Sequence, residues 1–224
     1  MFNNAKQLAQ IIDYTLVKPN ATLSDLSEAC ELAKKYDFAS VVVNSSYVTH
    51  ARKFLTGSHI KVCAVVGFPH GANTTTVKIF EAMEAVKNGA SELDIVMNIG
   101  MVKSGCLDFV EIDIKNIIAM TPQTTHKAII EVGSFTPNEI TLVSQIAARS
   151  GANFIKISTG YGPRGATAED VQHIKQVVGT MCLIKASGEI GSLAAVTAMV
   201  EAGANRIGTS HGPAIIEEYL QNSK

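Results

Sequence analysis

Two lysines lie in the middle of apolar, strand-like runs of this sequence. Lys156 occurs in residues 154–160 (FIKISTG), and Lys185 occurs in residues 183–188 (LIKASG). An ammonium group flanked by apolar residues loses hydration, which lowers its pKa, and like-charge repulsion between two close lysines lowers at least one pKa further. A lysine that is neutral near pH 7 attacks carbonyl carbons. The pair therefore predicts Schiff-base chemistry.

Asp94, in residues 92–96 (ELDIV), is another polar residue inside an apolar run. Two roles suit its carboxylate: general acid–base catalysis beside a reactive amine, or a structural ion pair with one of the two lysines. The sequence leaves both roles open. Asp13 also interrupts an apolar run, as do Lys127 and Glu131, which we assign to one strand. Each of these three could line a pocket or be structural.

Short apolar runs rich in β-branched residues alternate with amphipathic stretches along the whole chain. Eight runs are predicted to be strands: residues 11–16, 40–44, 62–67, 93–98, 128–132, 154–158, 182–186 and 206–209. Six stretches between them are predicted to be helices: residues 24–36, 75–87, 108–120, 137–149, 168–178 and 193–201. Three of these helices follow a threonine that stands three residues before a carboxylate, the pattern of a capping box: Thr22, Thr136 and Thr167.

Strand–helix alternation repeated eight times is typical of a closed parallel barrel. We therefore expect one α/β domain over residues 1–224, with the (β/α)8 TIM-barrel fold. A doubly wound open sheet is the alternative, but no Gly-x-Gly-x-x-Gly pattern follows the first strand.

A weak repeat links the polar residues to this barrel. Three predicted helices end in a Gly-Ala pair that leads at once into a strand, at Gly89, Gly151 and Gly203. A glycine suits the left-handed end of a helix. Five residues beyond these glycines lie Asp94, Lys156 and Gly208, on the fourth, sixth and eighth predicted strands. Alternate strands of such a barrel supply one interior layer, so we expect Asp94 and Lys156 to share a layer, with Gly208 leaving room beside them.

Turns that carry glycine follow the late strands, at Gly160, Gly188 and Gly208, the last followed closely by Ser210. Loops after strands seven and eight of a TIM barrel, together with a helix N-terminus, are the usual seat of a phosphate group. The turns together favour a phosphate-bearing substrate. The six histidines have no metal-ligand spacing, so no metal site is predicted.

Composition excludes several classes of protein. Hydrophobic residues make up 46% of the chain and charged residues 17%, with a formal net charge of −1, which excludes a disordered chain and a basic nucleic-acid surface. The four cysteines lack zinc or Cys-x-x-Cys spacing, as expected for reduced thiols. The first ten residues lack the apolar segment of a signal peptide, and no apolar run approaches the ~20 residues that span a membrane. We expect a cytoplasmic protein that binds neither nucleic acid nor membranes.

The chain resembles the deoxyribose-phosphate aldolase family over essentially its whole length. The matching stretches keep the family's order and spacing: residues 12–19 (IDYTLVKP), 38–44 (FASVVVN), 66–72 (VGFPHGA), 81–90 (EAMEAVKNGA), 156–160 (KISTG) and 185–188 (KASG). The resemblance implies a class I aldolase that reversibly cleaves 2-deoxy-D-ribose 5-phosphate to acetaldehyde and D-glyceraldehyde 3-phosphate, without a metal or an organic cofactor.

The resemblance also assigns roles that the residues alone leave open. It implies that Lys156 forms the Schiff base, that Lys185 depresses the pKa of Lys156, and that Asp94 transfers protons. The residues by themselves do not rank Lys156 over Lys185. Because the family commonly forms homodimers or larger homo-oligomers, we expect one of these assemblies.

The chain departs from the family's usual pattern at the predicted phosphate site. Glu189 stands where the family usually has a glycine, Gly191 where it has an arginine, and His211 where it often has a serine. A glutamate facing a phosphate dianion would be repulsive, so either Glu189 turns outward or the substrate ends differently. His211 or Arg164 could restore the positive charge.

Two alternative functions follow from these observations. The first keeps the Schiff base but uses a non-phosphorylated or otherwise different aldol substrate, which a comparison of deoxyribose with its 5-phosphate would reveal. The second is a non-catalytic barrel that binds sugar phosphates and whose lysines only pair with the ligand. The second alternative gives no catalytic role to Asp94, Lys156 and Lys185, although all three are present.

Overall fold

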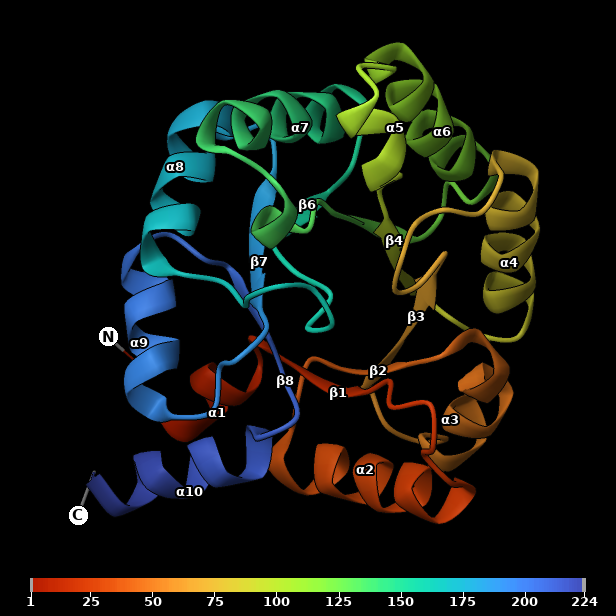
Figure 1. Ribbon diagram of the computed structural model, residues 1–224. Coiled ribbons are helices and arrows are strands. Elements are labelled where there is room, and N and C mark those ends of the chain that lie inside the picture. Colours follow the sequence, from red (N-terminus) through yellow and green to blue (C-terminus); the bar gives the residue numbers. More distant parts are fainter. Residues whose placement is uncertain (1, 223–224) are drawn as a thin grey trace.

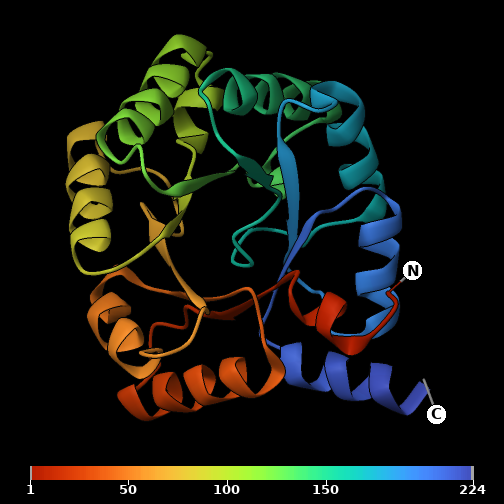
Figure 2. The same ribbon diagram turned by 180° about the vertical axis from the view of Figure 1, so that it is seen from behind.

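In the computed structural model, which describes residues 2–222, eight parallel strands form a closed barrel in the order β1 to β8. Helices surround the strands, as Figures 1 and 2 show from opposite sides. The strands are β1 (Ile12–Leu16), β2 (Ser40–Val43), β3 (Lys61–Val66), β4 (Glu92–Val96), β5 (Thr125–Ile129), β6 (Phe154–Lys156), β7 (Leu183–Ser187) and β8 (Arg206–Thr209). The predicted (β/α)8 barrel is confirmed.

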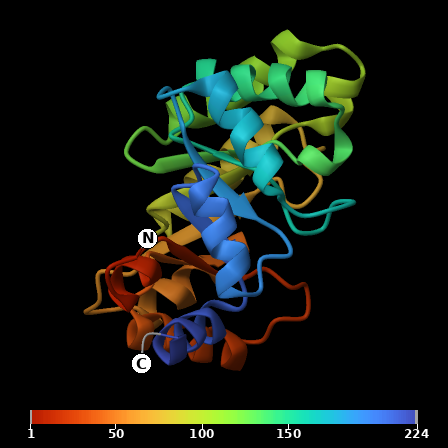
Figure 3. The same cartoon turned by 90° about the vertical axis from the view of Figure 1, so that its left-hand side faces the viewer.

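The helices follow the strands around the ring. They are α1 (Ala5–Ala9), α2 (Leu23–Tyr36), α3 (Val48–Phe54), α4 (Thr75–Lys87), α5 (Ile99–Lys103), α6 (Leu107–Met120), α7 (Pro137–Arg149), α8 (Ala168–Val178), α9 (Leu193–Glu201) and α10 (Gly212–Asn222). The predicted capping boxes at Thr22, Thr136 and Thr167 are all present. Helix α1 lies beside α10, so both ends of the described chain lie on one side of the barrel (Figures 1 and 3).

Some elements differ from the sequence prediction. Helices α1, α3 and α5 have only five to seven residues, which is too short for a helical hydrophobic period to appear. Helix α10 follows a glycine-bearing turn and was also not predicted. Strand β5 begins earlier than expected, because the polar residues from Thr125 onward pair with β4. Glu131 lies beyond this strand, in a left-handed conformation with φ of 52°.

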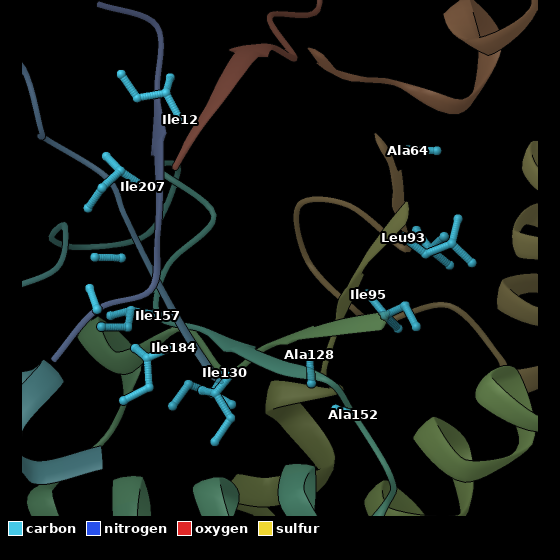
Figure 4. Packing of buried hydrophobic residues seen from close by; sticks show 14 of the residues in the cluster. Ile12, Ala64, Leu93, Ile95, Ala128, Ile130, Ala152, Ile157, Ile184 and Ile207 are labelled. Carbon is cyan, nitrogen blue, oxygen red and sulfur yellow. The ribbon is translucent and has the colours of Figure 1, made fainter. Parts of the chain in front are cut away.

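Along the strands, the apolar residues next to the polar candidates in the sequence point outward and pack beneath the helices. Leu93, Ile95 and Ile184 belong to this shell, part of which is drawn in Figure 4. Each large aliphatic side chain buried there contributes about 1.5–3 kcal/mol. Because side chains alternate along a strand, the residues between them, such as Asp94 and Lys185, face the barrel interior.

The interior side chains form three layers. As is typical of such barrels, each layer takes its side chains from alternate strands, in the register in which the strands pair. The upper layer, nearest the C-terminal strand ends, consists of Val42, Asp94, Lys156 and Gly208. The middle layer consists of Asp13, Cys63, Lys127 and Lys185. The lower layer consists of Ser40, Glu92, Phe154 and Arg206. The upper layer contains Asp94, Lys156 and Gly208, which the Gly-Ala repeat predicted to lie together in one layer.

No helix within residues 2–222 combines the length and the apolar character that crossing a lipid bilayer requires.

Candidate active site

Asp94, Lys156 and Lys185 meet inside the barrel. Asp94 lies in β4, Lys156 is the last residue of β6, and Lys185 lies in the middle of β7. Lys156 Nζ lies 2.9 Å from Asp94 Oδ2, and Lys185 Nζ lies 2.8 Å from the same oxygen. The three residues chosen from the sequence therefore form one hydrogen-bonded cluster.

Lys127 is a third lysine in this cluster. Its Nζ lies 2.9 Å from Asp94 Oδ1, and the Cys63 thiol donates to that oxygen across 3.1 Å. One buried carboxylate thus accepts hydrogen bonds from three buried ammonium groups. The ion pairs considered for Asp94 are present. They leave its carboxylate next to Lys156, where it can also transfer protons.

The interior charges continue below Asp94. Asp13 Oδ2 lies 2.5 Å from Lys185 Nζ, and Asp13 Oδ1 lies 2.8 Å from Arg206 Nη1. Glu92 Oε2 lies 2.5 Å from Lys127 Nζ. Each layer contains a carboxylate and at least one positively charged side chain, and such pairing offsets the cost of burying them. We call this set the sealed charge network, which comprises Asp13, Glu92, Asp94, Lys127, Lys185 and Arg206.

Lys156 has a different electrostatic environment from the other two lysines. Burial lowers the pKa of Lys156, Asp94 opposes that shift, and the positive charge of Lys185 adds to it. Burial also acts against the charged forms of Lys185 and Lys127, but the carboxylates that face them outweigh it and raise both pKa values. Lys156 has Asp94 as its one ion-pair partner within residues 2–222, and Lys185 has both Asp13 and Asp94. Lys156 is therefore the lysine that loses its proton most readily.

Asp94 remains ionised despite its burial. Burial raises the pKa of a carboxyl group, but Lys127, Lys156 and Lys185 outweigh this and hold the pKa of Asp94 well below its ordinary value. The cluster thus places an amine that can become neutral beside a carboxylate and a charged ammonium group. Such a set can combine nucleophilic attack with proton transfer.

A cleft of about 320 Å³ opens at the C-terminal ends of β1, β6, β7 and β8. Lys156 lines its floor, whereas Lys127 and Lys185 lie beneath it and do not line it. The cleft is also lined by the other residues that the sequence placed at a substrate site: Gly160, Gly188, Gly208, Ser210 and His211. Gly208 was expected to leave room beside Asp94 and Lys156, but the lysine next to it is Lys185, whose Cε would lie 3.0 Å from a Cβ at this position.

Glu131 supports the rim of the cleft. Its buried carboxylate accepts hydrogen bonds from the backbone N–H of Thr159, at 3.1 Å, and from the Thr159 hydroxyl. A Cβ at Gly162 would lie only 2.5 Å from the other carboxylate oxygen of Glu131. Glu131 therefore fixes the loop after β6. The sequence left open whether Glu131 lines a pocket or is structural, and these contacts are structural.

An aromatic pair lies above Lys156. The Tyr161 hydroxyl donates to the Val17 carbonyl across 3.2 Å and so joins the loop after β6 to the loop after β1. The Phe68 ring meets the Tyr161 ring edge-on, with centroids 5.6 Å apart, and its centroid lies 5.8 Å from Lys156 Nζ. At this distance the Phe68 ring can attract the ammonium group of Lys156 through a cation–π contact.

Arg164 does not supply the positive charge considered for it. Its guanidinium group binds the carboxylate of Asp170 in α8 through contacts of 2.5 and 2.9 Å, and it does not line the cleft. Asp13 and Lys127, considered as pocket residues, lie below the cleft in the sealed charge network. His211 does line the cleft.

Lys18 is a cleft residue that the sequence reasoning missed. It follows β1 by two positions, lies at the surface and lines the cleft. The sequence signal was the motif at residues 12–19, which ends in Val-Lys-Pro, but a lysine in a loop next to proline has the pattern of an ordinary surface residue. Glu189 lines the cleft as well, in a left-handed conformation with φ of 60°. Its carboxylate accepts the backbone N–H of Gly165 in the loop after β6, and Gly165 is not part of the cleft lining.

Within residues 2–222, no group of three or more His, Cys, Asp or Glu side chains could hold a metal ion. The closely spaced carboxylates of the barrel interior already face lysine or arginine side chains.

Comparison with known proteins gives the family. The model of the DeoC/LacD family aldolase matches residues 7–218. The deoxyribose-phosphate aldolase of Thermoanaerobacter sp. (strain X514) is 46% identical over 215 residues, which cover 95% of this chain and 96% of that protein. The chain belongs to the DeoC/LacD aldolase family.

Solved structures agree with membership of the DeoC/LacD family. QR15, an aldolase, has a TM-score of 0.93 and 40% sequence identity, covering 100% of this chain and 98% of that chain. A deoxyribose phosphate aldolase from Aeropyrum pernix, described as a unique tetrameric structure, has a TM-score of 0.92 and 28% identity, covering 99% and 94% of the two chains. The protein is thus an enzyme of the aldolase class, which argues against the non-catalytic alternative.

Proposed function

We propose that this aldolase reversibly cleaves 2-deoxy-D-ribose 5-phosphate to acetaldehyde and D-glyceraldehyde 3-phosphate through a Schiff base on Lys156. One observation carries the proposal: Lys156 lines the cleft with a lowered pKa, while Lys127 and Lys185 lie beneath the cleft with raised pKa values. The name of the Thermoanaerobacter relative, at 46% identity, supports this substrate.

The reaction begins when the neutral amine of Lys156 attacks C1, the aldehyde carbon of the open-chain sugar. The carbinolamine that forms loses water and becomes an iminium ion, which can accept an electron pair from the carbon chain. Asp94, at 2.9 Å from Lys156 Nζ, is placed to accept and return the protons of these steps.

Acetaldehyde carries C1 and C2, so the bond that breaks is C2–C3. A base removes the C3 hydroxyl proton, the electrons of the C2–C3 bond move into the iminium to give an enamine, and C3 leaves as the aldehyde of D-glyceraldehyde 3-phosphate. We assign the proton transfer to Asp94, through a water molecule and together with Lys185, 2.8 Å away. The same pair then protonates C2 of the enamine, and hydrolysis frees acetaldehyde and Lys156.

The phosphate group of the substrate would bind at the glycine-bearing turns of the cleft. Gly160, Gly188, Gly208 and Ser210 are part of the cleft lining. Exposed backbone N–H groups and hydroxyls of such turns suit phosphate oxygens. A non-phosphorylated aldol remains the second candidate, and the specific observation in its favour is the carboxylate of Glu189 on the cleft wall.

Borohydride reduction in the presence of acetaldehyde tests the nucleophile. We expect a two-carbon adduct on Lys156, located by peptide mass spectrometry and absent from Lys156→Ala. Lys53→Ala, a change of an exposed lysine in α3, serves as the control. An adduct confined to Lys185, or no adduct, would contradict the assignment. Turnover of 2-deoxyribose 5-phosphate compared with that of 2-deoxyribose tests the substrate, and a strong preference for the free sugar would favour the second candidate.

We also propose a homo-oligomeric, cytoplasmic enzyme. Helices α4 and α6 pack together and expose Phe80, Phe109 and Ile112, of which Phe80 is 70% exposed. Clustered exposed apolar side chains commonly mark contact surfaces between proteins. All four cysteines are free, which fits a reducing compartment. Light scattering should give a mass above 23.8 kDa, the mass of one chain, and Phe80→Glu should lower it.

A further inference from the structure

The charges that line the cleft are few and unevenly placed. Among the described residues the lining contains two lysines, Lys18 and Lys156, one histidine, His211, and one carboxylate, Glu189. Lys156 must face the carbonyl end of a substrate. An anionic group at the other end would therefore bind among Lys18, His211 and Glu189.

Lys18 is available to an anion. Within residues 2–222 no carboxylate forms an ion pair with its ammonium group, although the positive charge acts on the nearby Asp25. The Asp25 carboxylate is already engaged, because it accepts the Thr22 backbone N–H at 2.7 Å and the Thr22 hydroxyl at 2.8 Å. Lys18 lines both the cleft and a neighbouring cavity that is also lined by Asp25 and Glu28. Its flexible side chain stands between these two spaces.

Glu189 is held in place by the loop after β6. One of its carboxylate oxygens accepts the backbone N–H of Gly165 across 3.3 Å. This hydrogen bond ties Glu189 to the loop after β6, although the residue is exposed and carries the strain of a left-handed backbone. The negative charge is thus a fixed part of the cleft wall and repels any anion that binds beside it.

We propose that Lys18 binds the anionic terminus of the substrate and that Glu189 weakens this binding, so that the two residues together set the selectivity between phosphorylated and free sugars. The inference rests on the proposed function and deepens it. Lys18 supplies the positive charge that Arg164 cannot, since Arg164 is bound to Asp170. Glu189 limits the preference for a dianion and leaves the cleft open to uncharged substrates.

The test compares the ratio of kcat/KM for 2-deoxyribose 5-phosphate to that for 2-deoxyribose. Lys18→Met should lower this ratio about tenfold through KM, and Glu189→Gln should raise it about threefold, as expected for exposed charge pairs with a dianion. Lys18→Arg should retain most of the ratio, and the double variant should lie between the two single variants. Lys53→Met and Glu84→Gln remove the same charges from exposed positions in α3 and α4 and should leave the ratio unchanged.

Three outcomes would overturn the inference: an unchanged ratio in both variants, an equal loss for both sugars in Lys18→Met, or the same change in the two control variants. Failure of the proposed function is distinguishable, because it would leave the wild-type protein without an acetaldehyde adduct on Lys156. In that case calorimetric titration with inorganic phosphate still tests Lys18 and Glu189. Binding should be weaker in Lys18→Met and tighter in Glu189→Gln, and equal affinities would overturn the inference.

Discussion

The floor and the wall of the cleft differ in how they hold charge. Beside and beneath Lys156, the sealed charge network consists of side chains on strands, and nearly all of them are inaccessible to solvent. On the wall, Lys18, Glu189 and His211 lie in loops and are exposed. Lys18 has no ion pair there among the described residues, and Glu189 binds a backbone N–H group.

This difference separates the reaction from the choice of substrate. Removing one charge from the network leaves a buried partner with fewer opposite charges around it, so the network is part of the fold. An exposed charge contributes little to stability. Its residue can therefore be exchanged to suit another substrate at small cost to folding. In the proposals made above, the floor carries out the chemistry and the wall selects the substrate.

The largest expected effect is on turnover, in Asp94→Asn. Loss of the proton-transfer carboxylate should lower kcat by about 10²–10⁴-fold. The Lys156 adduct with acetaldehyde should still form, because Asp94 opposes the lowering of the Lys156 pKa and its removal favours the neutral amine. Steady-state kinetics and borohydride trapping measure the two effects separately. Turnover at the wild-type rate in a folded variant would remove Asp94 from the mechanism.

A matched pair of charge deletions compares stability on the floor and on the wall. Glu92→Gln leaves Lys127 without the carboxylate at 2.5 Å and should lower the free energy of unfolding by about 3–5 kcal/mol. Glu189→Gln removes the same charge from the exposed wall and should change it by about 0.5 kcal/mol or less. Urea unfolding followed by circular dichroism gives both values. Equal losses of unfolding free energy in the two variants would show that charges on the floor and on the wall contribute equally to stability.

A smaller effect is expected on the pH dependence, in Lys185→Leu. The positive charge of Lys185 helps to lower the pKa of Lys156, so its loss raises that pKa. Lys156 then becomes neutral only at higher pH, and the rate of adduct formation at pH 7 should fall severalfold while recovering in alkaline buffer. Stopped trapping reactions between pH 6 and 10 give the profile. An unshifted profile would mean that Lys185 does not tune Lys156.

The smallest effect is expected from added salt. Exposed charges are screened by salt and buried pairs much less, so raising the ionic strength should increase KM for 2-deoxyribose 5-phosphate about twofold. The KM for 2-deoxyribose and the yield of the Lys156 adduct should stay constant. A parallel change for both sugars would place the salt effect outside the cleft wall.

Much of the fold could be predicted from the chain because local chemistry and tertiary structure agree. The capping boxes at Thr22, Thr136 and Thr167 mark three helix starts correctly. The Gly-Ala repeat places Asp94 and Lys156 in one layer because each glycine ends a helix with positive φ and leads into a strand at a fixed offset. Strand β5 was misplaced because it begins with three polar residues, of which Lys127 faces the charged interior and His126 bonds to Thr121 and Thr124, so no apolar pattern marks its start.

Sequence by itself determined the barrel and the identity of the groups that could react. Apolar residues that alternate with single charges put the charges on one face of a strand, and in a barrel whose outer face is covered by helices that face is the interior. Tertiary structure alone decided what each charge does. The pKa of a lysine depends on the carboxylates within a few ångströms, and these come from β1 and β4, far from Lys156 and Lys185 in the chain. The same holds for Lys18, which becomes a cleft residue only because β1 closes the barrel against β8.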